Sequence, residues 1–251
     1  MMETYRTKEI ARLIGVHPNT VRLYEELGFI TPPERLENGY RVFTALQLGQ
    51  LRLARLALRG EVLQNGLRKK AVEIIRLCAA LDFVTAVKAS QDYETMLVQE
   101  IWQTKAAAAS VEAALNGKRE SDGIFLKRRE AAERLNVTMD TLRNWEHNGL
   151  IAVKRSQNGY RVYNGEDLER LNIIRTLRTA NYSLAAILRL TKRLEDDAPV
   201  SVAAILNTPA VDEDIVSVCD RLILSLENTR SDAKHMQTLL KSIESDFKTL
   251  H

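Results

Sequence analysis

A six-residue turn occurs twice in this chain of 251 residues, as NGYRVF at positions 38–43 and as NGYRVY at positions 158–163. The likeness extends upstream of the turn, because Thr4–Ile30 aligns with Phe125–Ile151 without a gap. Identical residues are Glu9/Glu130, Ala11/Ala132, Val16/Val137, Thr20/Thr141, Arg22/Arg143, Glu25/Glu146, Gly28/Gly149 and Ile30/Ile151, and, downstream of the turn, Leu48/Leu168, Leu51/Leu171 and Arg55/Arg175. An internal duplication of this kind predicts two copies of one structural unit.

Each copy predicts two short helices joined by a tight turn. In the first copy, apolar residues at helical spacing are followed by a break from Gly15 to Pro18. A second helix is then expected from Asn19 to Leu27, ended by Gly28, and its counterpart is Met139 to Asn148. This arrangement is typical of a helix-turn-helix.

The repeated hexapeptide predicts a β-hairpin, or wing, after those helices. Asn-Gly is a turn dipeptide that readily takes positive φ, and short β-prone runs lie on either side of it. The expected strands are Phe29–Ile30 with Arg41–Phe43, and Leu150–Ile151 with Arg161–Tyr163. With a following amphipathic helix, at 46–58 or 167–177, each copy predicts a winged-helix domain.

Charge alternates along the chain in step with the duplication. Residues 1–80 carry 13 basic and 8 acidic side chains and residues 124–195 carry 14 and 8, whereas 81–123 carry 4 and 7 and 196–251 carry 5 and 10. The two repeated blocks are therefore the basic ones, which favours a polyanionic partner. No run approaches 18 apolar residues and no export signal is evident, so we expect a cytoplasmic protein.

The two copies resemble the DNA-binding head of MerR-type transcriptional regulators. The resemblance rests on TVRLYEELGFI with NGYRVF and on TLRNWEHNGLI with NGYRVY. It implies a recognition helix in the major groove and a wing beside it, on double-stranded DNA, with RNA polymerase at a promoter as a further partner and bending of the DNA between half-sites. The DNA-contacting residues it implies are His17, Asn19, Thr20, Arg22, Tyr24, Tyr40 and Arg41 in the first head and Thr138, Thr141, Arg143, Trp145, Tyr160 and Arg161 in the second.

Some of these residues have a structural alternative. Arg22 and Arg143 could form intrahelical ion pairs with Glu25, Glu26 or Glu146. Tyr40 and Tyr160 could pack within their wings. Asp140 lies among the expected contact residues, but phosphates repel a carboxylate, so capping of its helix is the alternative.

The acidic blocks predict two long helices. Apolar residues at alternating spacings of four and three follow the C-terminal segment and form a seam of Ile215, Cys219, Leu222, Leu226, Met236, Leu240, Ile243 and Phe247. A heptad seam packs along another helix, and residues 83–115 offer that partner. The MerR-type resemblance implies that the helices after the heads pair antiparallel, so we expect an antiparallel coiled coil within one chain, which would make the chain a monomeric pseudo-dimer.

The sequence thus predicts a mainly α protein with the domains 1–80 (first head), 81–116 (long helix), 117–123 (linker), 124–196 (second head) and 197–251 (short helix and heptad helix). The function it favours is sequence-specific DNA binding in transcription regulation. An architectural or recombination-directing DNA-binding protein, or an adaptor that binds proteins through its long helices, are the alternatives. No nucleophile–base pair, glycine-rich phosphate loop or metal-ligand spacing is evident, so no enzyme activity, cofactor or metal is expected.

Overall fold

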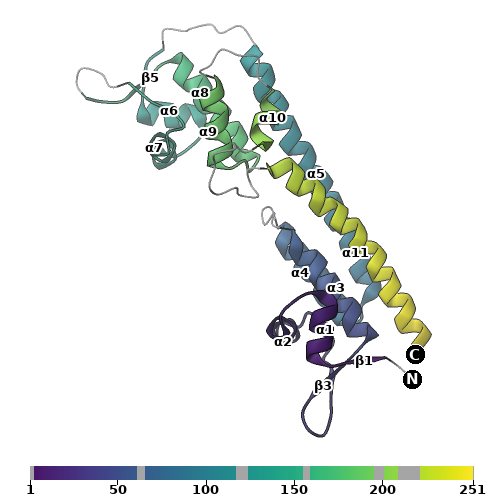
Figure 1. Ribbon diagram of the computed structural model, residues 1–251. Helices are drawn as coiled ribbons and strands as arrows, with labels where there is room; N and C mark the ends of the chain where they lie inside the picture. The colour runs from purple at the N-terminus through teal and green to yellow at the C-terminus, as the bar shows by residue number, and fades with distance from the viewer. Residues whose placement is uncertain are drawn as a thin grey trace. The chain divides into compact units, whose positions relative to one another are not determined.

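The computed structural model describes residues 3–60, 66–116, 124–154, 159–194, 201–208 and 221–250, and most of them are helical (Figure 1). The prediction of a mainly α chain is confirmed. The chain forms two compact units, one of residues 1–100 with 225–251 and the other of residues 101–224. The predicted linker at 117–123 lies outside the described residues.

The first head begins with β1 (Thr4–Tyr5), α1 (Thr7–Ile14) and α2 (Pro18–Glu26). The wing strands β2 (Glu34–Arg35) and β3 (Arg41–Thr44) follow, and then α3 (Ala45–Arg59) and α4 (Leu67–Ala79). The strands form one antiparallel sheet in the order β1-β3-β2. Apolar side chains of α1, α2, β3 and α3, with Ile30 from the segment after α2, share one core: Ile10, Ala11, Ile14, Val21, Ile30, Phe43, Leu48 and Leu51.

The second head repeats this order with β4 (Leu126–Lys127), α6 (Arg128–Leu135), α7 (Met139–His147), β5 (Val162–Tyr163) and α8 (Gly165–Thr179). Two short helices follow, α9 (Leu184–Arg193) and α10 (Val202–Asn207). The strand β4 pairs with β5, with Leu126 opposite Tyr163, as Tyr5 of β1 lies opposite Phe43 of β3. The turn residue Asn158 lies outside the described residues.

The prediction of strands at Phe29–Ile30 and Leu150–Ile151 is wrong. All four residues are buried and belong to no strand. Each pair begins three residues after the last residue of the recognition helix, and its apolar side chains enter the head core instead of joining a ladder. The strand that pairs with Arg41 and Val42 is Glu34–Arg35. This segment has no alternation of apolar and polar residues, so the sequence did not predict it.

The long helices α5 (Phe83–Asn116) and α11 (Leu222–Leu250) contact each other within the first unit (Figure 1). The rings of Phe83 and Phe247 lie 5.6 Å apart between centroids. The amide Nε2 of Gln237 donates to Oε2 of Glu94 at 3.0 Å, and Arg230 Nε lies 3.6 Å from Glu94 Oε1. Residue numbers rise along one helix as they fall along the other, so these segments run antiparallel.

The predicted seam is the buried face of α11 within the described residues. Leu222, Leu226, Met236, Leu240 and Ile243 are buried, and Phe247 is half-buried. Ile215 and Cys219 lie outside the described residues. Heptad packing of α5 with α11 as a coiled coil stays a prediction.

Each unit contains part of the long helix that follows the other head in sequence. Most of α11, which comes after the second head, belongs to the unit of the first head. The last part of α5, which comes after the first head, belongs to the unit of the second head, where the hydroxyl of buried Tyr182 donates to the carbonyl oxygen of Thr104 at 3.4 Å. Burial raises the pKa of Tyr182 to about 12.

The close approach of α11 to α3 occurs at a glycine. A Cβ added to Gly49 would lie 2.8 Å from Cγ1 of Ile243, which is inside van der Waals contact. Gly49→Ala is therefore expected to lower the free energy of unfolding by about 1–3 kcal/mol through overpacking, although alanine alone favours a helix by about 1 kcal/mol. Chemical denaturation measures this, and the double variant with Ile243→Ala is expected to cost less than the sum of the two single changes. Strict additivity would contradict the contact.

Candidate nucleic-acid interface

The recognition helices α2 and α7 each present one exposed face. On α2 this face consists of Asn19, Arg22, Leu23 and Glu26, at helical spacing. On α7 the equivalent face consists of Asp140, Arg143, Asn144 and His147. Thr20 and Thr141, which were also predicted to contact DNA, are half-buried beside these faces.

Two predicted contact residues are helix caps in this structure. Nδ1 of His17 accepts a hydrogen bond from the backbone N–H of Asn19 at 3.2 Å, at the start of α2. Oγ1 of Thr138 accepts from the backbone N–H of Thr141 at 3.0 Å, at the start of α7. Since Thr138 supplies the cap, the alternative that Asp140 caps α7 is wrong.

Removal of the Thr138 hydroxyl is expected to weaken the second head. Thr138→Ala leaves a donor of the first turn without its side-chain acceptor, which costs about 1 kcal/mol. The matched control is Thr179→Ala, because the Thr179 hydroxyl only donates to the carbonyl of Arg175 within its own helix. Urea denaturation of both variants measures the difference, and equal stability would contradict the capping role.

The recognition arginines are held by the residue three positions earlier. Nη1 of Arg22 donates to Oδ1 of Asn19 at 3.1 Å, and Nη1 of Arg143 donates to Oδ1 of Asp140 at 3.0 Å. The expected alternative, an ion pair with Glu25, Glu26 or Glu146, is not the pairing found for these arginines. Both guanidinium groups therefore take the same orientation along the exposed face of their helix.

The wing arginines pair with a glutamate of the recognition helix. Arg41 forms an ion pair with Glu25, and Arg161 forms one with Glu146. The glutamates are equivalent in the two copies, and their side chains are only 14% and 7% exposed. These pairs fasten each wing to its helix, so the structure gives Arg41 and Arg161 a positioning role that the resemblance did not predict.

Glu146 has two more partners in the second head. Nη2 of Arg128 donates to its Oε2 at 2.9 Å, and the hydroxyl of Tyr163 donates to its Oε1. Burial, followed by the hydrogen bond to Glu146, raises the pKa of Tyr163 to about 12. The first head has Phe43 at the position of Tyr163, and its Glu25 instead pairs with Arg35 at 3.3 Å.

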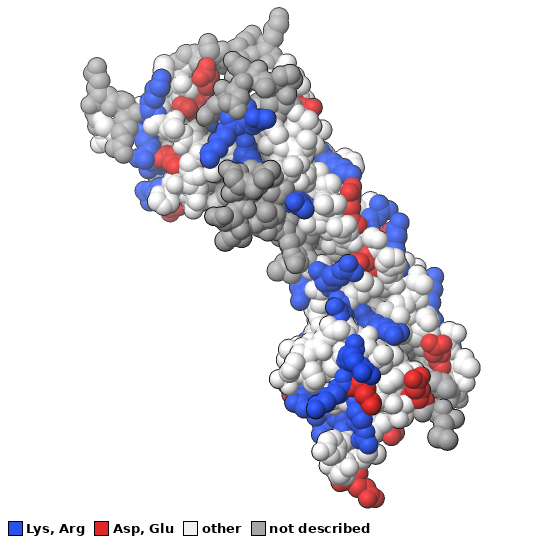
Figure 2. Space-filling model, in the orientation of Figure 1, with Lys and Arg blue, Asp and Glu red and all other residues white. Residues whose placement is uncertain are grey.

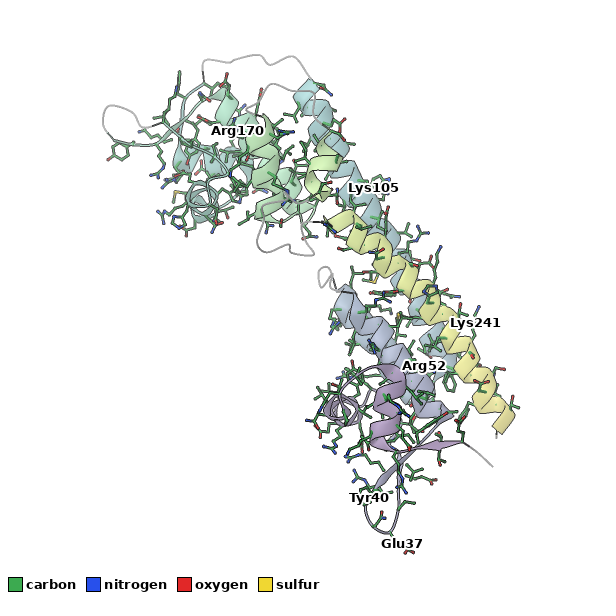
Figure 3. All side chains as sticks on the ribbon, viewed as in Figure 1. Glu37, Tyr40, Arg52, Lys105, Arg170 and Lys241 are labelled. Carbon is green, nitrogen blue, oxygen red and sulfur yellow. The ribbon has the colours of Figure 1, made fainter. Side chains whose placement is uncertain are left out.

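The predicted aromatic contact residues fall into two groups. Trp145 is 4% exposed, so its ring packs mainly within the head, and its contact with DNA stays a prediction; Tyr24 is half-buried and packs on the first core. Tyr40 and Tyr160 are 66% and 69% exposed, and Figure 3 shows Tyr40 beside Glu37 at the end of the first wing. Exposed wing tips suit contact with a partner.

An arginine of the third helix fastens the turn between the two helices in both heads. Nη1 of Arg55 donates to the carbonyl oxygen of Gly15 at 2.7 Å, and Nη1 of Arg175 donates to that of Leu135 at 2.9 Å. Gly15 and Asn136 end α1 and α6 in the left-handed conformation, with φ of 65° and 51°. The sequence signal for this bond is the identity of Arg55 and Arg175 in the duplication.

Lys and Arg gather on the surfaces of both heads, as Figure 2 shows for one face. A surface of this kind attracts phosphates. No group of three or more His, Cys, Asp or Glu side chains that could hold a metal ion occurs in the ranges the structure describes. Within those ranges, no helix is long and apolar enough to cross a membrane.

The fold and these contacts define a pair of winged helix-turn-helix heads. Comparison with known proteins finds two matching family models: residues 6–43 match one described as MerR family regulatory protein, and residues 126–194 match one described as MerR HTH family regulatory protein. The chain therefore carries two heads of the MerR type.

Relatives resemble only a short part of the chain. The HTH-type transcriptional regulator CueR of Escherichia coli O157:H7 is 45% identical over 49 residues, which are 20% of this chain and 36% of that protein. The nodulation protein NolA of Bradyrhizobium elkanii is 42% identical over 59 residues, or 23% of this chain and 27% of NolA. The alignments thus span about a third or less of these relatives. No solved structure matches the chain significantly.

Proposed function

We propose that this protein is a cytoplasmic transcription regulator that binds double-stranded DNA sequence-specifically through both heads. The observation that carries the proposal is that one arrangement occurs in both heads. An exposed helix face carries an arginine that is hydrogen-bonded to the residue three positions earlier, and the wing beside it is joined to the helix by a glutamate–arginine ion pair. A planar guanidinium donates two bonds to guanine or to a phosphate. The regulators among the matched relatives support the same reading.

The proposal includes one chain acting as its own dimer. A MerR-type head placed twice in one polypeptide offers two reading surfaces without a second subunit. The exchange of long helices supports this, because α11 lies in the unit of the first head and the end of α5 lies in that of the second. Two half-sites are then bound by one molecule, with bending of the DNA between them and RNA polymerase as a partner at the promoter.

Binding and mass measurements test the proposal together. DNA enriched from a random pool is titrated at several salt concentrations, and the affinity is expected to fall steeply with salt, since each neutralised phosphate contributes about −0.9 to the log–log slope. Arg22→Ala and Arg143→Ala should each weaken binding by about tenfold. Light scattering of the complex should give one chain per site. Absence of any enriched sequence would remove the proposal, and two chains per site would remove the pseudo-dimer.

A further inference from the structure

The two recognition helices agree on their inner sides and differ on their exposed faces. Facing inward or half-buried on these helices are Thr20/Thr141, Val21/Leu142, Tyr24/Trp145 and Glu25/Glu146, which are identical or similar in the two heads. Facing outward are Asn19/Asp140, Arg22/Arg143, Leu23/Asn144 and Glu26/His147, of which the arginine alone is shared. Differences are thus concentrated where the helix would meet a base edge.

The side chains that differ between the two heads offer different hydrogen-bond donors and acceptors. The fold of the helix does not require these differences. Asn19 and Asp140 occupy the same place, and each holds its arginine at about the same distance, 3.1 and 3.0 Å. An amide offers a donor and an acceptor to adenine, whereas a carboxylate only accepts, as from the amino group of cytosine. Leu23, 47% exposed, suits a thymine methyl group, whereas Asn144 suits adenine.

We infer that the two heads read different half-sites, so that the DNA site of this protein is asymmetric. The halves share the base pair read by Arg22 or Arg143 and differ at the neighbouring pairs, where the differing side chains lie. This inference rests on the proposed function. It assigns the specificity to the positions 19/140, 23/144 and 26/147, all on the exposed faces of α2 and α7.

Binding-site selection from random double-stranded DNA tests the inference with the full chain. The wild type is expected to enrich a site with two unlike halves. The triple variant Asp140→Asn/Asn144→Leu/His147→Glu gives α7 the exposed face of α2, and it should enrich a site with two like halves. It should also prefer that symmetric site over the wild-type site by about tenfold. Asp140→Asn alone should change one base pair in one half.

Controls separate the possible failures. The reciprocal variant Asn19→Asp/Leu23→Asn/Glu26→His gives α2 the exposed face of α7, so both halves of the selected site should match the half read by the second head. This variant tests the inference if the first variant does not fold. Asp246→Asn, at another exposed carboxylate, on α11, should leave the selected site unchanged. A wild type that enriches a perfect palindrome, or variants that keep two unlike halves, would overturn the inference while DNA binding stands. Failure to enrich any sequence would instead remove the proposed function.

Discussion

Glu146→Ala is expected to destabilise the second head by about 3–5 kcal/mol, the usual cost of breaking a buried ion pair from one side. The carboxylate is 7% exposed and accepts from Arg128, pairs with Arg161 and accepts from the Tyr163 hydroxyl. Its removal leaves two guanidinium groups and a hydroxyl with their shared acceptor gone. Thermal unfolding followed by circular dichroism measures the loss, and amide exchange in α6 and α7 locates it.

Glu133→Ala is the matched control. Oε1 of Glu133 also accepts from an arginine at 2.9 Å, here Arg129, but its side chain is 65% exposed. An exposed pair of this kind contributes between 0 and about 1 kcal/mol, so the control should unfold nearly like the wild type. Equal stability of the two variants would mean that the Glu146 cluster does not fasten the wing. Restoration of stability in Glu146→Gln would point to hydrogen bonding rather than charge.

The first three helices of each head could be predicted because their signals are local. Gly28 and Gly149 take positive φ directly after the recognition helices, as the sequence indicated. The regular spacing from Leu222 onward likewise predicted the buried face of α11. These features depend on periodicity and on single residues with restricted conformations, which can be read without knowledge of the rest of the fold.

The contacts of the site could not be predicted, because they join distant segments. The sequence offered pairing of Glu25 and Glu146 with the arginines three residues earlier only as an alternative, and the glutamates pair instead with wing arginines about 15 positions later. Whether the apolar dipeptide Phe29–Ile30 joins a sheet or a core is decided by what lies opposite it, and here it is buried. The identity of both glutamates in the two copies was the signal that could have singled them out.

Leu240→Ala is expected to destabilise the first unit by about 3 kcal/mol, within the range for removing a buried leucine and leaving a cavity. Leu240 is fully buried on α11, one turn from Gln237, which bonds to Glu94 of α5, and one turn from Ile243, which lies against Gly49 of α3. Because α11 belongs to the unit of the first head, the damage should appear there. Amide exchange should rise in α3 and α4, although the change lies far along the chain from both.

The neighbouring residue Lys241 supplies the control, because its side chain is exposed on the same helix (Figure 3). Lys241→Ala should change the free energy of unfolding by less than about 0.5 kcal/mol. If Leu240→Ala were equally mild, α11 would not belong to the core of the first unit, and the assignment of α11 to the first head would lose its support. If amide exchange instead rose in α6 and α7 while α3 stayed protected, α11 would stabilise the head that precedes it in sequence. The chain would then be two tandem heads, each with its own helix, rather than a pseudo-dimer.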